Sequence, residues 1–472
     1  MAEVSGATTG GVLSQIIALG AADTHLTANP EVTFWRARVQ KCTNFAYESI
    51  LQNFTKAEFG NQGSVIMNRT GDLVYWMYIL IDLPGIKAVR VPSSNQSRAS
   101  AKFPPPYVET PSTASDNEIG HCGDPFADEF ADYPAEDDVG LDGAPYANWV
   151  NEIGHAMIEQ VSFTIGGQII DSVYSHYLHM WEELAGQPGK RLEEMIGKRM
   201  THAQLVADSA HARRLYVPIP FYFTRHSGNA LPLVSLQFHS VQIHATFTSL
   251  KDLIQVSGPD VEVQTCGGTT IEPSGSNLQF NAQLDTTYIY LDMEERDRFA
   301  VGSFQQLITQ VQRTQESIGS GTDRMNTNLS FNHPTIELLW AVRRNCHKLA
   351  NNFFNYSGYG NTDPITKATL SINGLARFSR EATFFRLKVP YEAHTNIPRN
   401  FIYAYSFALK PEDCQPSGSL NFSRIDQSKF SLTLPTKPDS DTKTGNDDFI
   451  MFARNYNILR FREGLGGLMF SN

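Results

Sequence analysis

The sequence predicts an all-β protein with two domains. Most of its apolar segments are short, rich in aromatic or β-branched residues and bounded by turn residues, as in the strands of a sandwich or barrel. The chain has 472 residues, which exceeds the ~250–300 residues at which a single core stops growing. Hydrophobic residues make up 41% and charged residues only 18%, so there is apolar material for two cores. The low charge also fits a surface partly hidden in assembly contacts.

The clearest strands lie in the first half. Leu73–Leu83 is almost continuously apolar, which indicates a strand buried on both faces. Thr33–Val39 alternates large apolar with charged or small residues, as a half-buried strand does. In Gln160–Asp171, Gly166 and Gly167 separate two β-rich halves and can both take the positive φ of a type I′ turn, so we expect a hairpin. Two more strands are expected, the first at a sheet edge because it contains prolines: Leu215–Phe223 and Leu231–Phe247.

One segment has helical periodicity instead. Ser175–Ala185 places Leu178 and Trp181 on one face, and Gly186 follows as a stop signal. This predicts a short loop helix between strands. We expect a corresponding helical insertion in the second half, at Ser303–Gln312.

The second half repeats the same types of element. Its expected strands are Thr286–Leu291, Thr335–Val342, Ala382–Val389, Phe401–Leu409, Phe430–Leu434 and Phe449–Phe461. We place the domain boundary near Leu250, with a margin of about 10 residues. Two turn-rich polar segments are expected to be exposed loops, Ser112–Asp142 and Pro435–Asp447.

The charge distribution argues against direct nucleic-acid binding. The net charge is −11, whereas proteins that neutralise phosphates cluster Lys and Arg. The densest basic stretch, Gly189–Met200, contains two glutamates and is interpreted as a solvated helix face.

Cysteine usage and the amino terminus suggest a soluble protein made in a cytoplasm. The five cysteines have an odd count and wide spacing, which predicts free thiols in a reducing compartment. They are Cys42, Cys122, Cys266, Cys346 and Cys414. The apolar stretch Val12–Ala22 has no Lys or Arg before it, so it does not look like a secretory signal.

Two groups of residues have some likeness to metal sites. His176, His179, Glu182 and Glu183 do not have the HExxH spacing of zinc peptidases, and a polar helix face is the preferred interpretation. An acidic segment could hold a hard cation, but it lacks the order of an EF-hand and is expected to be a solvated loop. Its acidic residues are Asp124, Asp128, Glu129, Asp132, Glu136, Asp137 and Asp138.

No pattern predicts catalysis or a cofactor. Gly189-Lys190 lacks the other residues of a phosphate-binding loop, and Gly464, Gly466 and Gly467 follow a terminal strand instead of opening a helix. No GxSxG elbow occurs, and no local signature selects a hydrolase triad. Six N-x-S/T sequons leave surface sugars possible, at Asn53, Asn68, Asn95, Asn328, Asn355 and Asn421, the last of which is better explained by local structure. We therefore assign no catalytic, cofactor-binding or metal residue.

Several motifs resemble the major capsid proteins of nucleocytoplasmic large DNA viruses. Gly20–Ala46 resembles their amino-terminal signature, in which a Leu-Thr-x-Asn-Pro turn leads into an aromatic strand ending in Thr-Asn-Phe. The matching residues are Leu26, Thr27, Asn29, Pro30, Phe34, Trp35, Thr43, Asn44 and Phe45. Further similar segments follow in order: Ile165–Asp171, Leu231–His239, Tyr288–Ala300, Gln415–Asp426 and Phe452–Asn472. The resemblance covers nearly the whole chain and is strongest to iridovirus-like or marseillevirus-like members.

This resemblance implies a double jelly-roll of two consecutive eight-stranded sandwiches with short loop helices. The expected parts are an arm over 1–29, a first jelly-roll over 30–250 and a second over 251–472. The chain would be a structural protein and not an enzyme. It would form a homotrimeric, pseudo-hexagonal capsomer that contacts neighbouring capsomers, minor capsid proteins and penton proteins. The arm would lie near an internal membrane, and assembly would take place in the host cytoplasm.

Two other classes of protein remain open from the residues alone. A binding module, such as a jelly-roll lectin, would be a monomer or dimer with a defined sugar or calcium site. A β-sandwich glycosidase would need two carboxylates ~5–10 Å apart in a cleft.

Overall fold

The computed structural model describes residues 18–31, 34–35, 41–90, 146–190, 192–257, 261–272, 278–319, 321–358, 360–435 and 446–470. The chain divides into two compact units, Met1–Asn44 and Phe45–Asn472. The first unit contains the short helix α2 (Thr24–Thr27). The second unit contains all the sheets that are described below.

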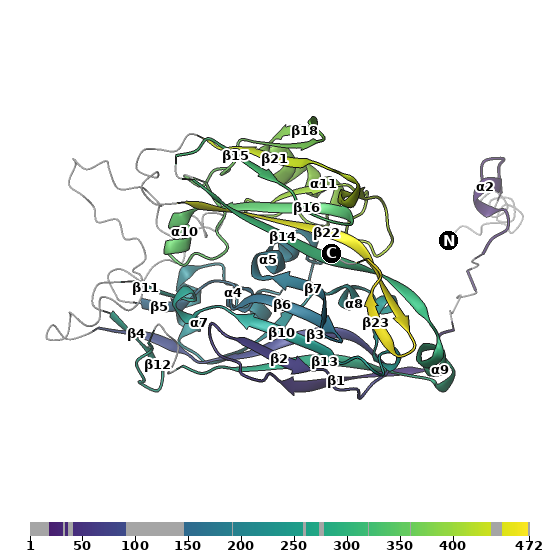
Figure 1. Ribbon diagram of the computed structural model, residues 1–472, viewed down its shortest axis with the longest axis horizontal. Helices are drawn as coiled ribbons and strands as arrows, with labels where there is room; N and C mark the ends of the chain where they lie inside the picture. The colour runs from purple at the N-terminus through teal and green to yellow at the C-terminus, as the bar shows by residue number, and fades with distance from the viewer. Residues whose placement is uncertain are drawn as a thin grey trace, which may run out of the picture. The chain divides into compact units, whose positions relative to one another are not determined.

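The first set of strands forms a jelly-roll (Figure 1). One sheet has the order β1 (Phe45–Asn53), β13 (Asn281–Leu291), β3 (Leu73–Leu83) and β8 (Arg213–Pro218), and β9 (Leu231–Pro232) also pairs with β3. The facing sheet has the order β2 (Gln62–Ile66), β10 (Val241–Phe247), β6 (Ile158–Ile165) and β7 (Gln168–Tyr174). All these pairs are antiparallel.

The second set of strands repeats this arrangement. One sheet has the order β14 (Phe304–Ile318), β22 (Asp447–Arg462), β16 (Pro334–Arg343) and β19 (Tyr403–Ser406), extended by β20 (Leu420–Asn421) and β23 (Leu465–Leu468). The facing sheet has the order β15 (Arg324–Asn328), β21 (Ser428–Thr433), β17 (Lys367–Ile372) and β18 (Leu375–Glu381). If the eight main strands of each set are numbered along the chain, both sets have sheet orders 1-8-3-6 and 2-7-4-5. The fold is therefore a double jelly-roll, as the family resemblance implied.

The remaining elements connect these strands. Two small ladders extend the first jelly-roll, where β4 (Ile86–Arg90) pairs with β12 (Val261–Thr265) and β5 (Tyr146–Trp149) pairs with β11 (Ile254–Ser257). The α-helices are α4 (Ile153–Ala156), α5 (Ser175–Ala185), α6 (Glu193–Ile196), α7 (His202–Ser209), α8 (Tyr222–Arg225), α9 (Met293–Val301), α10 (Asn345–Leu349) and α11 (Val389–Ala393). Short 3-10 turns are η3 (Ser227–Asn229), η4 (Leu233–Ser235), η5 (Leu250–Asp252) and η7 (Phe422–Arg424), and η6 (Phe384–Lys388) is a π-helix. In the described residues, none of these helices is long and apolar enough to cross a bilayer.

Each jelly-roll encloses its own core. In β3, Met77, Ile79 and Ile81 point inward and are almost completely buried. In the second jelly-roll Trp340 is fully buried, and its ring lies 5.1 Å from Phe385 and 5.2 Å from Phe430 between centroids. Large aromatic rings account for much of the apolar area that such a core removes from water.

Several predicted elements are confirmed. Strand β3 and helix α5 have the bounds that periodicity predicted. The hairpin β6–β7 turns at Gly166 and Gly167, whose φ angles of 57° and 84° only glycine adopts readily. The prediction that β3 is buried on both faces does not hold along the whole strand, however, because Trp76 on its outer face is 43% exposed.

Other predicted elements are wrong. The segment expected to be helical at 303–312 lies in strand β14, which pairs with β22 over fifteen residues. The expected strand at 382–389 is mostly the π-helix η6, in which Phe385 is buried, and α11 follows directly with Pro390 in its first turn. The expected strand 215–223 ends at Pro218, and 231–247 is interrupted by η4.

Three expectations concern segments that lie wholly or partly outside the described residues. The first is the strand over 33–39, of which Phe34 and Trp35 alone are described and lie in a turn, and the second is the loop over 112–142. Most of the expected loop over 435–447 also lies outside them.

The boundary expected at residue 250 does not coincide with the change in strand pairing. Strands β11, β12 and β13 follow residue 250, yet all pair with strands of the first jelly-roll. Strand β13 is the eighth strand of the first jelly-roll and lies between β1 and β3 in its sheet. The first jelly-roll therefore extends to the end of β13. Pairing changes between Leu291 and Phe304, where α9 connects the two jelly-rolls.

The expectation of five free thiols is wrong, as Cys346 shows. Cys346, which is buried in α10, is disulfide-bonded. Cys42, Cys266 and Cys414 are free.

The second core should respond strongly to a cavity at its centre. Leu338 in β16 is fully buried, so Leu338→Ala should lower the free energy of unfolding by about 2–5 kcal/mol. Leu409→Ala is the matched control, because Leu409 is 82% exposed and the change should cost less than about 0.5 kcal/mol. Urea unfolding followed by tryptophan fluorescence measures both, and equal effects would contradict this description of the core.

Candidate functional site at the junction of the jelly-rolls

The sheet β14-β22-β16-β19 is covered on both of its faces. Along β16, Leu338 and Trp340 point into the second core, whereas Leu339 and Ala341 belong to the apolar cluster of the first jelly-roll. Phe452 in β22 likewise faces the first jelly-roll and has no exposed area. This double burial defines the junction, the surface on which the two jelly-rolls pack.

The first jelly-roll supplies β7 and α5 to the junction. The rings of Tyr174 and Tyr177 pack on Phe452 at centroid distances of 5.9 and 5.6 Å. The guanidinium of Arg313 in β14 lies 4.9 Å from the centre of the Tyr174 ring. In Figure 1, α5 and β7 lie beside β14 and β22. Helical periodicity predicted α5, but nothing local to the sequence identified its partner.

Trp181 of α5 lies between two arginines. The Arg225 guanidinium is 4.2 Å and the Arg454 guanidinium 4.6 Å from its ring centre. Such cation–π contacts contribute most where the cation is removed from water, and Arg454 is almost completely buried. Arg454 comes from β22 of the second jelly-roll, so this contact joins the two domains.

A buried chain of ionic groups holds Arg454 in place. Its Nε lies 2.9 Å from Oε1 of Glu337, and the other oxygen of Glu337 lies 3.2 Å from Nε2 of His394. His394 Nδ1 is 3.0 Å from Glu412. Burial would raise the pKa of Glu337, but Arg454 and His394 lower it to about 2. Burial would lower the pKa of His394, but Glu337 and Glu412 raise it to about 9. All four groups are therefore charged at neutral pH.

Asp171 joins the edge strands of the two jelly-rolls. Its Oδ1 accepts hydrogen bonds from the backbone N–H of Val311 in β14 at 3.0 Å and of Ser172 at 2.9 Å. Gln310 next to Val311 donates to the carbonyl of Ile170. Burial raises the pKa of Asp171 to about 7, against the opposing effect of both N–H donors and of Arg225.

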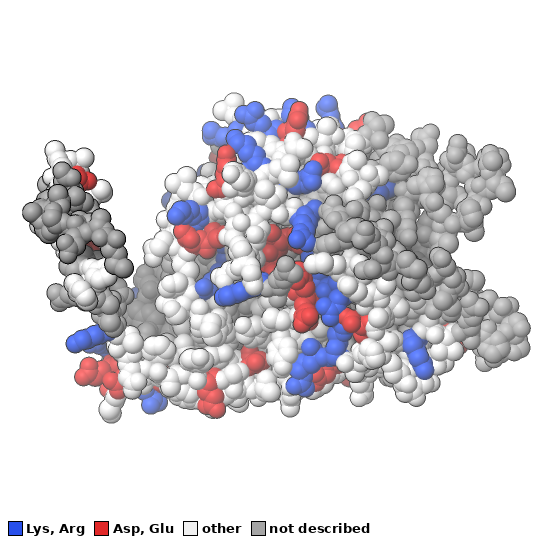
Figure 2. Space-filling view, turned by 180° about the vertical axis from the view of Figure 1, so that it is seen from behind, with Lys and Arg blue, Asp and Glu red and all other residues white. Residues whose placement is uncertain are grey.

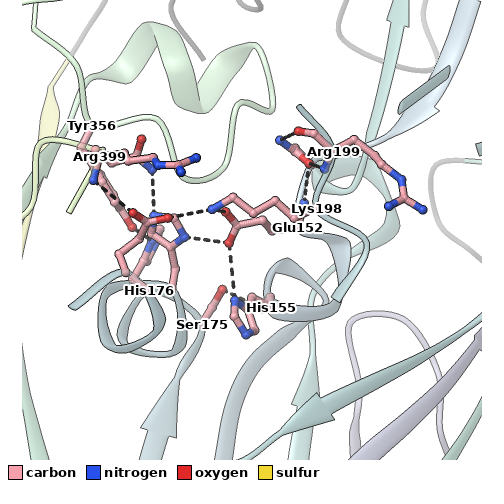
Figure 3. Close-up of polar contacts among 12 residues, drawn as sticks. Glu152, His155, Ser175, His176, Lys198, Arg199, Tyr356 and Arg399 are labelled. Atoms are coloured by element: carbon pink, nitrogen blue, oxygen red, sulfur yellow. Dashed lines mark hydrogen bonds and ion pairs between the residues drawn. The ribbon is translucent and has the colours of Figure 1, made fainter. Parts of the chain in front are cut away.

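A second polar cluster surrounds Lys198 (Figure 3). Lys198 Nζ lies 2.6 Å from Glu152 Oε1 and 2.7 Å from Glu183 Oε1. Burial would raise the pKa of Glu152, but His179 and Lys198 hold it well below its usual range. Burial also opposes ionisation of Glu183, whose pKa is lowered chiefly by Lys198. The arrangement is a partly buried cation between two carboxylates.

Histidines link this cluster to the second jelly-roll. Asn400 Nδ2 lies 2.9 Å from His179 Nε2, and His179 Nδ1 lies 2.7 Å from a carboxylate oxygen of Glu152. His176 Nδ1 lies 2.8 Å from the Tyr356 hydroxyl. Both histidines are buried, and burial holds the pKa of His176 well below its usual range. The polar helix face expected for them is thus a buried contact between domains.

The metal-like pattern noted in the sequence is explained by Lys198. Ligand atoms of Glu152, His179 and Glu183 lie within 4.8 Å of one another. The Lys198 ammonium already lies within ion-pair distance of both carboxylates, where a metal ion would otherwise bind. Sequence reasoning identified His179 and Glu183 but missed Glu152 and Lys198, which approach α5 only in the folded chain. A polar cavity of about 440 Å³ adjoins the cluster.

Two of the motifs noted in the sequence form a further contact between the domains. Phe238 N donates to the Gly464 carbonyl at 3.0 Å, and His239 Nδ1 lies 3.0 Å from the Gly466 carbonyl. A Cβ on Gly464 would lie 2.6 Å from the Phe238 ring, and its φ is +81°. These glycines therefore let the terminal hairpin β22–β23 approach the first jelly-roll, and no phosphate loop is formed.

Apart from Asn355, which lines the cavity beside Lys198, the other residues noted in the sequence lie away from the junction or outside the described residues. Asn421 accepts from Ser423 N at 3.0 Å, and Ser423 Oγ accepts from His333 N at 2.8 Å, so both hold a turn. Among the described sequons, Asn53, Asn68 and Asn328 are exposed whereas Asn355 is buried. Asn95 and the acidic residues 124–138 lie outside the described residues.

Comparison with known proteins matches both parts of the chain to family models. Residues 33–105 and 127–292 match the model described as the major capsid protein N-terminus. Residues 295–467 match the model described as the large eukaryotic DNA virus major capsid protein. The interval between the two matches falls where strand pairing changes from one jelly-roll to the other.

Individual relatives match over almost their full length. The chain is 30% identical to the major capsid protein of Phaeocystis pouchetii virus, with 98% of this chain and 100% of the relative covered. It is also 30% identical to the major capsid protein of Paramecium bursaria Chlorella virus 1, with the same shares covered. A quasi-atomic model of the PBCV-1 virus capsid superposes with a TM-score of 0.67 at 27% identity, over 93% of this chain and 100% of that chain.

The raised pKa of Asp171 predicts a pH-dependent stability. Between its ordinary pKa and about 7, the folded chain holds a proton that the unfolded chain has lost, so stability should fall as pH rises through this window and then level off. Asp171→Asn keeps the acceptor oxygen without the charge. It should raise the free energy of unfolding at pH 8 by up to about 4 kcal/mol, with no gain near pH 4.

Urea unfolding at pH 4, 6 and 8 tests this expectation. Asp82→Asn is the control, because the hydrogen bond from Arg214 lowers the pKa of Asp82 and its removal should not stabilise the chain at pH 8. An Asp171→Asn variant with the pH dependence of the unsubstituted chain would show that Asp171 is not a buried titrating group.

The cluster at Lys198 predicts a large loss on removal of its cation. Lys198→Met leaves Glu152 and Glu183 without a partner and should destabilise the fold by about 3–5 kcal/mol. Lys190→Met, at an exposed lysine, should change stability by less than about 0.5 kcal/mol. Thermal and urea unfolding measure both variants. Unchanged stability in Lys198→Met would mean that the ammonium does not stabilise this pair of carboxylates in the folded chain.

Proposed function

The chain belongs to the family of large eukaryotic DNA virus major capsid proteins, and from this premise we propose that three copies form one pseudo-hexagonal capsomer of an icosahedral shell. As a capsid-forming protein it acts through its shape and its contacts. Each copy contributes two jelly-rolls with the same strand order, so a ring of three copies presents six similar units. Six similar units around one axis fit a hexagonal lattice.

The double burial of the sheet β14-β22-β16-β19 carries this proposal. Because Leu339 and Phe452 are buried against the first jelly-roll, the two jelly-rolls of one copy are joined by a hydrophobic contact, in contrast to domains held only by a linker. A capsomer in a regular lattice must keep a fixed shape, and such a contact fixes the orientation of its two jelly-rolls. The buried ionic chain of Glu337, Arg454 and His394 adds directional contacts to the same surface.

We propose a structural role and no enzymatic one. The polar clusters at the junction pair their charges internally, as Lys198 does with Glu152 and Glu183, and their groups connect elements of the fold. We further propose that the capsomer contacts neighbouring capsomers, minor capsid proteins and penton proteins, and that the arm over 1–29 contacts an internal membrane. We also propose that the capsid assembles in the host cytoplasm. The boundary between the two jelly-rolls is proposed to lie within residues 292–303.

The solution mass of the purified chain tests the trimer. Light scattering coupled to gel filtration should give three times the 52.6 kDa of one chain, and negative stain should show pseudo-hexagonal outlines. A stable interface of this kind should bury well over about 1,000 Å². A monomer that stays monomeric at the highest concentrations used would contradict intrinsic trimerisation, and carbohydrate binding would then become the alternative to test.

A further inference from the structure

The polar cavity beside Lys198 lies where loops of the two jelly-rolls meet. Its volume of about 440 Å³ falls within the range of ~300–1,000 Å³ that small-molecule sites have. One wall belongs to the first jelly-roll and the other wall to the second. The lining residues include Glu183, Lys198 and Met200 on the first wall and Asn355, Arg399 and Phe401 on the second.

Connections between the main strands form both walls of this cavity. The first wall consists of residues just before α4 and of the connection 175–212, between β7 and β8. The second wall consists of the connections 344–366, between β16 and β17, and 382–402, between β18 and β19. Binding residues in proteins concentrate on loops that a rigid scaffold holds in position. Because the doubly buried sheet fixes the two jelly-rolls, it also fixes the two walls.

The charges that line the cavity are balanced. Four acidic and four basic side chains take part in the lining. Several of them pair with each other, as Lys198 does with Glu183 at 2.7 Å and Arg386 with Asp363 at 3.1 Å. Figure 2 likewise shows acidic and basic side chains interspersed along the middle of the molecule. The cavity therefore offers hydrogen-bond donors and acceptors without a net charge, which favours an uncharged polar ligand.

The second wall contains a buried donor that the described residues leave unpaired. Asn355 is only 6% exposed. Its Oδ1 accepts a hydrogen bond from Ser357 N at 2.9 Å, whereas its Nδ2 has no partner among the described residues. A buried donor without a partner costs about 1–3 kcal/mol. An oxygen atom held at this wall would remove that cost.

Aromatic rings lie among the polar groups of the second wall. The Phe354 ring stacks on His179 at 4.5 Å between centroids, and the Arg386 guanidinium lies 4.9 Å from the centre of the Phe401 ring. These contacts hold both rings in place beside the cavity. A sugar ring has an apolar C–H face and hydroxyl groups that both donate and accept hydrogen bonds. Fixed aromatic rings next to amide, carboxylate and guanidinium groups match both properties.

We propose that this cavity binds a neutral saccharide, as one or two sugar units at the end of a glycan chain. The hydroxyl groups of the sugar exchange hydrogen bonds with the polar side chains of both walls, Arg399 among them. The C–H face packs on an aromatic ring of the second wall. Because each jelly-roll supplies one wall, the site exists only when the two are packed together.

The position of the cavity in the fold gives the site its role. Strands β1 and β3 both pair antiparallel with β13, so the connection that follows β3 lies at the opposite end of the sheet from Phe45, where β1 begins. Figure 1 shows α10, whose connection lines the cavity, at the opposite end from α9 and β23. In the proposed shell the arm before Phe45 contacts an internal membrane, so the cavity faces outward, toward glycans of a host surface. On this point alone the inference rests on the proposed function.

Saturation-transfer NMR on the purified full chain tests the site. The probes are the methyl glycosides of glucose, galactose, mannose and N-acetylglucosamine, followed by an array of neutral glycans, and at least one of them should bind. Arg399→Ala should weaken that binding by about tenfold, the loss expected for one hydrogen bond to a charged group. Met200→Trp should abolish it by filling the cavity from the first wall.

Arg424→Ala is the matched control, because Arg424 is exposed and does not line the cavity. It should bind the sugar as the unsubstituted chain does, and circular dichroism and the melting temperature verify the fold of every variant. Absence of binding to all probes and to the array would overturn the inference, as would binding that both cavity variants retain. Light scattering on the same samples keeps the two proposals apart. A trimer that binds no sugar would leave the proposed function standing, and a monomer that binds sugar would contradict the trimer and support the site.

Discussion

The packing of one sheet between two hydrophobic cores is the constraint on which the rest of the structure depends. Strands β16 and β22 are apolar on both faces, because one face encloses the second core and the other meets the first jelly-roll. Fully burying one large apolar side chain contributes about 1.5–3 kcal/mol relative to leaving it exposed. Separating the jelly-rolls would expose Leu339, Ile450 and Phe452 together, so the two domains behave as one body.

The charged groups at the junction determine how the two jelly-rolls fit. A buried ion pair adds little net stability, because desolvation offsets much of the attraction, but leaving one member unpaired is costly. Glu337 needs both Arg454 and His394, and Glu152 needs Lys198 and His179. A shifted packing of the jelly-rolls would break these pairs. The hydrophobic contact thus provides the attraction, and the ionic groups select one orientation.

Much of the fold could be predicted from the sequence where the pattern is local. The apolar run of β3, the Gly166-Gly167 turn and the periodicity of α5 each depend on neighbouring residues alone, and all three were confirmed. Strand β14 was mistaken for a helix because its many glutamines and threonines hide an alternation that only its long pairing with β22 makes evident. The π-helix η6 was mistaken for a strand because apolar content does not show which side chains enter the core.

The site was harder to predict than the fold, for a physical reason. His179 and Glu183 stand out in the sequence because they lie on one helix. Their role in the fold depends on their contacts with Glu152 and Lys198, which come from other loops. Without Lys198 in view, the same residues suggest a metal site. The polar contacts between the jelly-rolls, such as that of Asp171 with Val311, join residues 140 positions apart and leave no local trace.

The central claim is that burial of one sheet on both faces fixes the two jelly-rolls of a chain as one body, and that three such bodies form the proposed capsomer. An electron cryomicroscopy map of the purified assembly, at a resolution that separates strands, tests it most directly. The account predicts a ring of three copies in which β14, β22, β16 and β19 of each copy lie between the two cores of that copy. A ring of another number of copies, or jelly-rolls that take different relative orientations in different copies, would contradict it.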